Sequence, residues 1–420
     1  MSANDKPLTI CDLTQSFSLT GGGGITTYLG EKAKYVLANT PHTLIQIVPG
    51  ERDQVIENGR HIRVHVGAAG QPNTPAYRFI FRTGAVRDVL ERFRPDIIES
   101  QCPWLLPWTA IRYGSAHPES ALVAGYRTDF PTAQIHRVFN KTLGPQVAEV
   151  ARNAAKKHAR RTYKRFDRVY VLGEAGRGAL REYGIDDVSV LDLGVHAEIF
   201  SPDKRDPEWR RDMGHEGDGP LLVYVGRFDP EKRPGTLIEA LRRLPRELGA
   251  RLVMIGNGRG EDDLRAQAKG LPVTFAGFFS NRHELARGLA SSDIYVSGMA
   301  DETFGISIIE AQAAGLPVVG VASGAMPERV EPGTGLLGPV EDADAMAANI
   351  LAVWNGNHDA MGAAARALIE RRYSWDKTFA NLFGNIYPAA LAARDARIAS
   401  GVKRPVLPRV RDRYGAFDFG

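Results

Sequence analysis

Cysteine is scarce in this chain of 420 residues, which contains only Cys11 and Cys102. Two cysteines cannot build the disulfide framework of a small secreted domain, and they fit a reducing compartment. The first residues, Met1–Lys6, also lack the apolar core of a signal peptide. We therefore expect a cytoplasmic protein.

Long uninterrupted apolar runs are absent as well. The longest mostly apolar stretch, Ile306–Ala325, is broken by Glu310, Gln312 and Pro317. A membrane-spanning helix needs about 20 consecutive apolar residues, so the sequence predicts none. It also contains no solenoid repeat, which excludes a repeat architecture.

The composition is that of a globular protein, with 43% hydrophobic and 24% charged residues. A chain of this length exceeds one ordinary hydrophobic core and predicts two domains. The net charge of +4 is unevenly distributed. Residues 1–200 carry 25 Lys and Arg against 20 Asp and Glu, whereas residues 201–420 carry 28 against 29. The basic surplus therefore belongs to the first half.

Strand-like and helix-like segments alternate along the chain. The strand-like runs are Leu8–Cys11, Thr43–Val48, Ile62–Val66, Asp96–Glu99, Leu122–Tyr126, Arg168–Leu172, Val188–Leu191, Leu221–Val225, Leu252–Ile255, Val273–Phe275, Ile294–Ser297 and Pro317–Val321. Such alternation predicts parallel sheets flanked by helices, the doubly wound α/β class. The polar stretch Pro202–Gly219 is expected to link two such units, and a last long helix is expected from near Trp375 to Ser400.

Two acids, Glu302 and Glu310, lie eight residues apart, the first on a loop and the second in an apolar helical pattern. If the helix begins near Ile306, Glu302 lies above its N-terminus and Glu310 faces inward about one turn down. The two carboxylates are then separated by at most about 12 Å along the axis, and backbone N–H groups at the helix start can face an anion between them. A nucleoside diphosphate sugar has this layout. The alternative is a pair of solvated acids.

A charged segment, Gly226 to Lys232, directly follows the strand-like run that ends at Val225. Arg227 and Lys232 are five residues apart across a turn, so both can converge on one anion beyond the carboxyl end of the strand, where ligands of open α/β sheets bind. Arg offers a planar fork to phosphate oxygens and Lys a point charge. The alternative is a turn closed by salt bridges to Asp229 and Glu231.

Glycine-rich turns occur at two further places. Gly256-Asn257-Gly258 follows the strand-like run that ends at Ile255, and glycine there lets backbone approach a ligand closely. The run Gly21–Gly24 precedes a helix expected to begin near Ile25, but it lacks the spaced glycines and later acid of a dinucleotide-binding fingerprint. The alternatives are an ordinary turn and a flexible surface loop.

These segments resemble family 4 glycosyltransferases of the GT-B fold. The resemblance rests on the Glu302–Glu310 segment, the Ala313–Val319 stretch behind it and the Gly226–Lys232 segment. It implies an α/β protein with two doubly wound Rossmann-like domains facing a cleft. Residues 1–198 with a C-terminal helix over 376–420 are expected to form the acceptor-side domain, and residues 199–375 are expected to bind the nucleotide-sugar donor.

The resemblance also implies a role for each motif residue. Glu302 is expected to contact hydroxyls of the donor sugar, Glu310 the ribose, and Arg227 and Lys232 the diphosphate. The other expected donor-binding positions are Gly23, Gly24, Gly256, Gly258, Phe278, Phe304, Gly305 and Ile306. The expected catalytic residues are Glu302, Arg127, Arg227 and Lys232. Transfer is expected to proceed with retention of anomeric configuration, without a metal or a cofactor.

Arg127 is the main departure from the family pattern. Related enzymes that act on lipid acceptors commonly have Tyr-His-Thr-Asp-Phe-Pro where this chain has Tyr126-Arg127-Thr128-Asp129-Phe130-Pro131. An arginine that faces the sugar favours an acidic one, because it pairs with an anion through two hydrogen bonds. The alternatives are that Arg127 pairs with Asp129 or another nearby acid, or that activity is lost or altered.

Five basic residues recur at every fourth position and predict a cationic helix face. They are Arg152, Lys156, Arg160, Lys164 and Arg168. An anionic membrane surface attracts such a face by about 1 kcal/mol per basic residue, and a solvated helix face is the alternative. Nucleic acid is not expected, since stacking aromatic residues are not interleaved with the charges.

The sequence therefore predicts a retaining glycosyltransferase that moves a sugar from a UDP-sugar or GDP-mannose to a membrane glycolipid or diacylglycerol. Peripheral attachment to the inner face of the plasma membrane accompanies this hypothesis. A polysaccharide intermediate is the alternative acceptor. A nucleotide-sugar epimerase and a non-catalytic nucleotide-sugar binding protein are the alternative functions, because a shared fold does not decide function.

Overall fold

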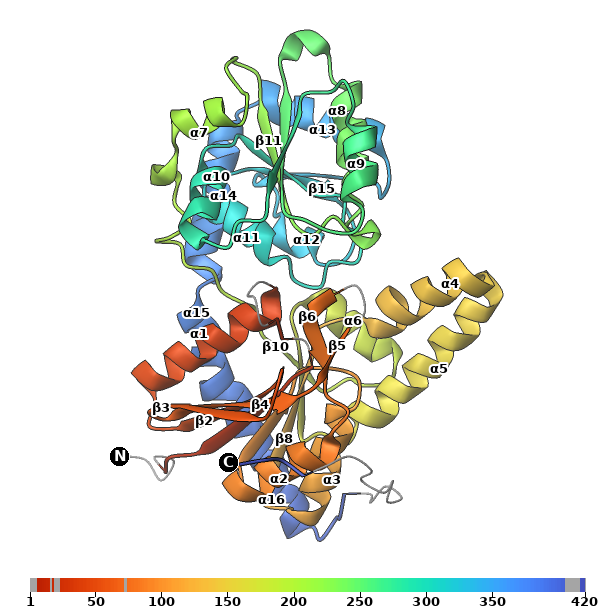
Figure 1. Cartoon of the computed structure of the whole chain (residues 1–420), viewed down its shortest axis with the longest axis vertical. Coiled ribbons are helices and arrows are strands. Elements are labelled where there is room, and N and C mark those ends of the chain that lie inside the picture. The colour runs from red at the N-terminus through yellow and green to blue at the C-terminus, as the bar shows by residue number, and fades with distance from the viewer. Residues whose placement is uncertain (1–5, 16, 19–22, 72–73, 405–415, 420) are drawn as a thin grey trace. The chain divides into compact units, whose positions relative to one another are not determined.

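The computed structural model describes residues 6–15, 17–18, 23–71, 74–404 and 416–419. The chain divides into two compact units (Figure 1). The first unit is Met1–Leu191 with Phe379–Gly420, and the second is Asp192–Thr378. The predicted first segment ends at residue 198, whereas the first segment of the first unit ends at residue 191. The predicted C-terminal segment begins at residue 376, and that of the unit begins at residue 379.

An eight-stranded sheet forms the centre of the first unit, in the order β10-β9-β8-β7-β1-β2-β4-β3. Its strands are β1 (Thr9–Leu13), β2 (Thr43–Gly50), β3 (Gln54–Asn58), β4 (His61–Gly67), β7 (Ile97–Ser100), β8 (Ala121–Tyr126), β9 (Arg168–Val171) and β10 (Val188–Val190). Neighbouring strands are parallel except for the edge pair β3–β4. A separate antiparallel pair consists of β5 (Ala69–Gln71) and β6 (Thr74–Phe79).

Helices lie on both faces of this sheet. They are α1 (Gly24–Asn39), α2 (Thr83–Phe93), α3 (Leu106–Ala116), α4 (Arg137–Leu143), α5 (Pro145–Tyr163), α6 (Glu174–Glu182) and α16 (Tyr387–Ala399), with π-helical turns over Pro131–His136 and Leu382–Ile386. Apolar side chains of α2, α3, α5 and α6 share one core with the strands. Helices α1 and α16 reach the same buried carboxylate, Glu99 of β7, through Tyr28 and Tyr387.

The second unit contains a six-stranded parallel sheet in the order β13-β12-β11-β14-β15-β16. Its strands are β11 (Leu221–Val225), β12 (Arg251–Ile255), β13 (Val273–Gly277), β14 (Ile294–Val296), β15 (Val318–Val321) and β16 (Gly335–Gly338). Its helices include α7 (Pro207–Asp212), α8 (Pro234–Arg243), α9 (Glu261–Gln267), α10 (Arg282–Ala290), α11 (Ile306–Ala313), α12 (Met326–Arg329), α13 (Ala343–Asn355) and α14 (His358–Arg372). Side chains of α8, α9 and α13 pack with the strands into one core.

The alternation predicted from the sequence is confirmed, because each of the twelve strand-like runs overlaps a strand. The predicted helix after residue 375 consists of α15 (Trp375–Asn381), a π-helical turn and α16. The sequence analysis missed β3, whose residues are mostly exposed at the sheet edge. It also missed β16, whose four residues begin and end with glycine and therefore carry little apolar signal.

The expectation that Pro202–Gly219 is a linker is wrong. This stretch contains α7, whose Trp209 is only 4% exposed. Arg210 donates to the carboxylate of Asp293 at 3.0 Å, and Arg205 donates to the same carboxylate at 2.7 Å. Its polar composition therefore reflects ion pairs within the second unit, of which it is a part, and not a solvated connection.

The prediction of one continuous basic helix face is also partly wrong. Helix α5 ends at Tyr163, so Lys164 is its C-terminal cap and Arg168 begins β9. Arg152 pairs with Glu149 at 2.7 Å, and Arg168 pairs with Asp187 at 2.6 Å. The shared spacing of four residues thus extends beyond the helix that would give it a common face.

Candidate active site

Two loops meet at the switch point of the six-stranded sheet. Strands β11 and β14 are neighbours, and the chain leaves β11 toward β12 but leaves β14 toward β15, on opposite sides. Ligands of open α/β sheets bind beyond the carboxyl ends of the strands at such a point. The loop after β11 carries Arg227 and Lys232, and the loop after β14 carries Glu302. The fold therefore brings the two predicted motifs together.

Lys232 and Glu302 face each other across these loops. Lys232 Nζ lies 3.5 Å from Glu302 Oε2 and 2.8 Å from Met299 Sδ. Glu302 Oε1 accepts hydrogen bonds from the N–H groups of Thr303 at 3.1 Å and Phe304 at 3.4 Å. The side chains of Lys232 and Glu302 are 23% and 18% exposed, so a ligand can reach both charges.

The guanidinium of Arg227 is held by the acids of its own turn. It forms an ion pair with Asp229, and its Nη2 donates to Glu231 Oε1 at 2.7 Å. The alternative of a turn closed by salt bridges is therefore correct for Arg227. Lys232 instead pairs with Glu302 in the loop after β14. Arg227 is still 55% exposed, so its free edge is accessible to an anion.

Gly256 and Gly258 let the turn after β12 pack directly on the loop after β11. A Cβ at Gly256 would lie 1.9 Å from the carbonyl oxygen of Gly226, and one at Gly258 would lie 2.6 Å from the nitrogen of Phe228. The N–H of Phe228 donates to the carbonyl of Asn257 at 2.8 Å. Close backbone packing thus explains why both positions are glycine, and their contact with a donor stays a prediction.

Helix α11 begins at Ile306, which satisfies the condition set in the sequence analysis. Gly305 precedes it with φ of 85°, a backbone conformation that favours glycine. A Cβ at Gly305 would lie 3.3 Å from Cγ of Glu302, so the Glu302 side chain packs against the helix start. The first N–H groups of a helix have no earlier carbonyl of that helix to bond. The positive end of the helix dipole therefore lies beside Glu302.

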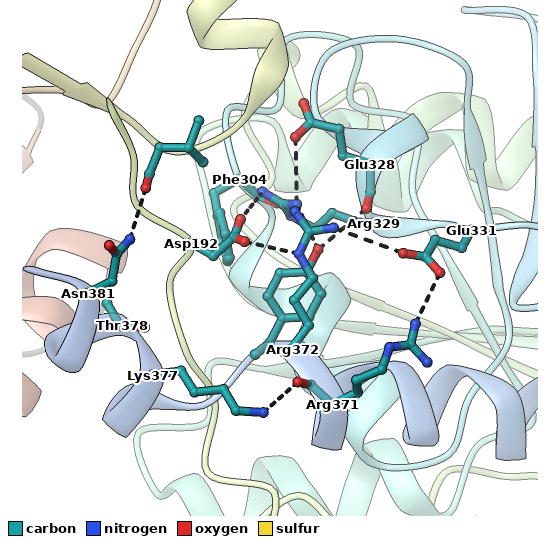
Figure 2. A network of polar contacts seen from close by, with 12 residues as sticks. Asp192, Phe304, Glu328, Arg329, Glu331, Arg371, Arg372, Lys377, Thr378 and Asn381 are labelled. Atoms are coloured by element: carbon teal, nitrogen blue, oxygen red, sulfur yellow. Dashed lines mark hydrogen bonds and ion pairs between the residues drawn. The ribbon is translucent and has the colours of Figure 1, made fainter. Parts of the chain in front are cut away.

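The ring of Phe304, in the loop that carries Glu302, packs against the guanidinium of the buried Arg329 (Figure 2). The guanidinium carbon of Arg329 lies 4.1 Å from the Phe304 ring centroid, and Arg329 Nε donates to the Phe304 carbonyl at 2.9 Å. Arg329 also donates to the hydroxyl of Tyr373 at 2.9 Å and lies 3.7 Å from Asp192. The Phe304 side chain is only 2% exposed and holds this loop in place, and its predicted contact with the donor stays a prediction.

The same network extends to helix α14. Arg372 donates to Asp192 Oδ2 at 3.0 Å and lies 3.9 Å from Glu331, which also pairs with Arg371 at 3.4 Å (Figure 2). Asp192 is the first residue of the second unit. The loop that carries Glu302 is thus connected through Arg329 to both ends of the unit.

Glu310 lies in α11, and its side chain is buried. Arg282 Nη2 donates to Glu310 Oε1 at 2.6 Å. Burial raises the pKa of Glu310, and the nearby Arg282 acts in the opposite direction. Arg282 is 40% exposed, so a ribose that reaches Glu310 meets this guanidinium as well. The sequence analysis missed Arg282, because no motif surrounds it.

The two remaining predicted donor contacts in this unit are accessible. Phe278 follows β13, and its side chain is 51% exposed. Ile306 is half-buried at the start of α11. Their predicted contact with the nucleotide is compatible with these positions and stays a prediction.

The first unit has its own switch point, between β1 and β7. The chain after β1 leads to Gly23, which caps α1 with φ of 83°, and Gly24 is the first residue of that helix. Gly21 and Gly22 lie outside the described residues. Gly23 and Gly24 therefore occupy a helix start, as predicted, and their contact with donor phosphates stays a prediction.

Arg127 follows β8 and is buried, with 7% of its surface exposed. Its guanidinium carbon lies 3.9 Å from the ring centroid of Tyr28 in α1, and its Nη2 donates to the hydroxyl of Tyr170 at 2.9 Å. The Tyr170 hydroxyl in turn donates to Glu99 Oε1 at 2.6 Å. Arg127 is thus joined to a buried acid through a tyrosine.

The predicted alternative is that Arg127 pairs with Asp129 or another nearby acid. The pair with Asp129 is wrong, and the nearby acid is Glu99, reached through Tyr170. Asp129 Oδ1 accepts hydrogen bonds from the hydroxyls of Tyr126 at 2.7 Å and Tyr183 at 2.6 Å. Since aromatic rings enclose the Arg127 guanidinium, a direct pair with an acidic sugar requires this packing to open.

Glu99 is the centre of a buried cluster that the sequence analysis missed. Its carboxylate accepts hydrogen bonds from Tyr28, Tyr170 and Tyr387 and pairs with Lys32 at 3.0 Å. Lys32 also pairs with Asp12, and these three charged side chains are fully buried. Buried charges are tolerated only when paired and hydrogen-bonded. No local pattern could reveal the cluster, because its members are dispersed along the sequence.

Among the residues that the structure describes, no three His, Cys, Asp or Glu side chains gather in a way that could hold a metal ion. None of the described helices is long and apolar enough to cross a membrane.

Two family models match the chain, one in each unit. The model "Glycosyltransferase Family 4" matches residues 22–199, and "Glycosyl transferases group 1" matches residues 205–372. The chain belongs to the GT-B glycosyltransferases. Among solved GT-B structures, sucrose-phosphate synthase from Thermosynechococcus elongatus has the same fold, with a TM-score of 0.73 and 20% identity over 92% of this chain and 100% of that one.

Curated relatives of this GT-B glycosyltransferase are themselves glycosyltransferases, and one of them is named for a lipid acceptor. The GDP-mannose-dependent alpha-(1-6)-phosphatidylinositol dimannoside mannosyltransferase of Mycobacterium tuberculosis is 29% identical over 84% of this chain and 90% of its own length. Sulfoquinovosyl transferase SQD2 of Arabidopsis thaliana is 28% identical over 72% of this chain and 58% of its own.

Proposed function

We propose that this glycosyltransferase moves a hexose from a nucleoside diphosphate sugar, GDP-mannose or a UDP-sugar, to the headgroup of a membrane glycolipid or diacylglycerol. The observation that carries the proposal is the meeting of Lys232 and Glu302, 3.5 Å apart, beside the start of α11. One cation, one hydroxyl-binding carboxylate and a helix N-terminus match the diphosphate and sugar of such a donor. The phosphatidylinositol dimannoside named as acceptor of the mycobacterial relative supports the acceptor class.

The transfer breaks the bond between the anomeric carbon and the diphosphate oxygen and forms one to an acceptor hydroxyl. Lys232 and Arg227 stabilise the negative charge that develops on the departing diphosphate. Glu302 accepts hydrogen bonds from the sugar hydroxyls and orients the ring. The acceptor attacks from the face that the diphosphate leaves, its proton passes to a leaving-group oxygen, and configuration is retained. No metal is required in this scheme.

A neutral hexose fits the surroundings of Arg127 better than an acidic one. The Arg127 guanidinium packs on Tyr28 and donates to Tyr170, so it is already engaged inside the first unit. In this scheme Arg127 positions α1 by packing against Tyr28, and it is not a direct partner of the sugar.

The lipid acceptor implies peripheral contact with the inner face of the plasma membrane. Lys156 and Arg160 lie in α5, and Lys164 caps its end. Such cations attract anionic headgroups.

The test is nucleotide release over a panel of UDP- and GDP-sugars, neutral and acidic, with and without vesicles that contain diacylglycerol or phosphatidylinositol. We expect release with a neutral hexose donor only when lipid is present. Conversion of the donor into an epimeric nucleotide sugar without an acceptor would favour the epimerase, and donor binding without any turnover would favour a non-catalytic role. Turnover of an acidic sugar alone would restore direct recognition by Arg127.

A further inference from the structure

Helices α4 and α5 form a hairpin that extends away from the sheet of the first unit (Figure 1). Gly144 makes the turn between them with φ of 86°, and Pro145 begins α5. No residue of α4 is buried, and the buried residues of α5 are confined to Ala148 and the segment from Ala159 to Tyr163. The far end of the hairpin therefore has little support from the rest of the unit.

Four large apolar side chains are exposed on this hairpin. They are Val138 at 55%, Leu143 at 61%, Val147 at 43% and Val150 at 71%. Twelve large hydrophobic residues are exposed in the whole described chain, so a third of them fall within residues 138–150. Scattered exposed apolar residues are normal, whereas their concentration in one short segment indicates an interaction surface.

The same segment carries an excess of positive charge. Residues 137–163 contain seven Lys and Arg and one acid, Glu149, and Glu149 pairs with Arg152. Arg137 and Lys141 are exposed beside the apolar residues of α4, and Lys157 and Arg160 are exposed on α5. Two copies of such a hairpin repel each other, so charge disfavours self-association through this surface.

We propose that the α4–α5 hairpin inserts the side chains around Leu143 and Val150 into the interface of an anionic lipid bilayer. Apolar side chains next to Lys and Arg match the acyl and headgroup layers of such an interface. The inference rests on the proposed lipid acceptor and adds the element that makes the contact. Val138, Leu143, Val147 and Val150 supply the apolar contact, and the neighbouring cations bind the headgroups.

The hairpin is joined directly to the candidate site residues of the first unit. The chain leaves β8 at Tyr126, passes Arg127 and the π-helical turn Pro131–His136, and enters α4 at Arg137. A bilayer bound at the hairpin therefore lies at the end of the segment that starts beside Arg127.

The first test places an environment-sensitive dye on single cysteines. Cys11 and Cys102 are buried, so a dye reacts selectively at Leu143→Cys or Val150→Cys, with Ile56→Cys as the matched control on exposed β3. We expect a blue shift at positions 143 and 150 on adding phosphatidylglycerol vesicles, a weaker one with phosphatidylcholine, and none at position 56. No shift at the hairpin, or an equal shift at all three positions, would overturn the inference.

The second test measures vesicle partitioning by sedimentation. The double variant Leu143→Gln/Val150→Gln is expected to bind phosphatidylglycerol vesicles at least about tenfold more weakly, since it removes two apolar contacts, while Ile56→Gln binds as the parent chain does. Unchanged binding by the double variant, with its fold confirmed by circular dichroism, would contradict insertion.

These tests use no donor and no acceptor, so they are independent of transferase activity. Vesicle insertion without sugar transfer would leave the hairpin inference standing and remove the proposed function. Transfer to lipid without insertion would support the proposed function and overturn the hairpin inference.

Discussion

At the scale of single residues, the candidate site depends on charges that approach from separate loops. Lys232 is the clearest case, because its ammonium has no acid partner in its own turn but meets Glu302 after β14. Arg227 differs, since Asp229 and Glu231 share its charge. We infer that Lys232 contributes more than Arg227 to stabilising the leaving diphosphate.

Removing the charge of Lys232 or that of Glu302 should abolish most turnover without unfolding the chain. We expect Lys232→Ala and Glu302→Ala each to lower kcat by about 10²-fold to 10³-fold, the effect of losing one preorganised electrostatic contact. Lys269→Ala, which removes an exposed lysine from the same unit, serves as the matched control. Steady-state nucleotide release measures the effect, and most of the activity surviving in Lys232→Ala would argue against its role.

His61 should make the stability of the first unit depend on pH. Burial, with Arg63 nearby, lowers the pKa of His61 to about 4. Its Nε2 donates to Gln46 Oε1 at 2.9 Å, because the Gln46 amide nitrogen is used toward Asp12 and Leu29. In the unfolded chain the imidazole regains its ordinary pKa of about 6.5. The unfolded state therefore binds more protons between these two values.

The stabilisation is complete above the ordinary pKa and is lost as pH falls from about 6.5 toward 4. Between pH 8 and pH 5 the parent chain should lose about 1 to 2 kcal/mol more stability than His61→Gln. Urea unfolding of both proteins at the two pH values measures the difference. Equal pH dependence would show that His61 titrates alike in both states.

At the scale of elements, the position of Glu302 depends on close backbone packing. Gly324 has φ of 58°, and a Cβ there would lie 2.6 Å from the carbonyl oxygen of Glu302 and 2.7 Å from that of Ala300. Ala325 N donates to the Glu302 carbonyl at 2.8 Å. The loop after β15 thus holds the loop after β14 in place.

Gly324→Ala should therefore displace Glu302 and lower kcat/KM by more than about tenfold, because a small misplacement of a reacting group costs much of the rate. Gly270→Ala is the matched control, since Gly270 has φ of 77° but no atom within 4 Å of a built Cβ. Both variants carry backbone strain, and only the first carries the clash. Equal loss in the two variants would assign the effect to strain alone.

At the scale of the whole molecule, each unit has a sheet, a core and a switch point of its own. The donor motifs lie in the second unit, whereas the buried Asp12, Lys32 and Glu99 cluster lies in the first. A substitution in that cluster should therefore act on the stability of the first unit and not on donor chemistry directly.

Lys32→Met should destabilise the first unit by about 3 to 5 kcal/mol, because it leaves two buried carboxylates without their cation. Lys34→Met, in the same helix but 71% exposed, should change stability by less than about 0.5 kcal/mol. Urea unfolding with limited proteolysis identifies which unit opens first. Similar stability in the two variants would mean that the cluster contributes little.

The sequence by itself determined the alternation of strands and helices and the motifs that carry the donor chemistry. These signals are local, since apolar strands alternate with helices and parallel strands present their loops at one edge. The start of α11 at Ile306 could be predicted from the glycine and the apolar pattern after it. The four-residue spacing of the basic residues led to the wrong prediction of one continuous helix face, because a spacing does not show where α5 ends.

Only the tertiary structure decided which distant side chains share an environment. It paired Arg282 with Glu310 and buried Arg127 between Tyr28 and Tyr170. It also left Val138, Leu143, Val147 and Val150 of α4 and α5 exposed. The physical reason is the same in each case. Burial and pairing depend on contacts between segments far apart in the chain, and no local pattern records them.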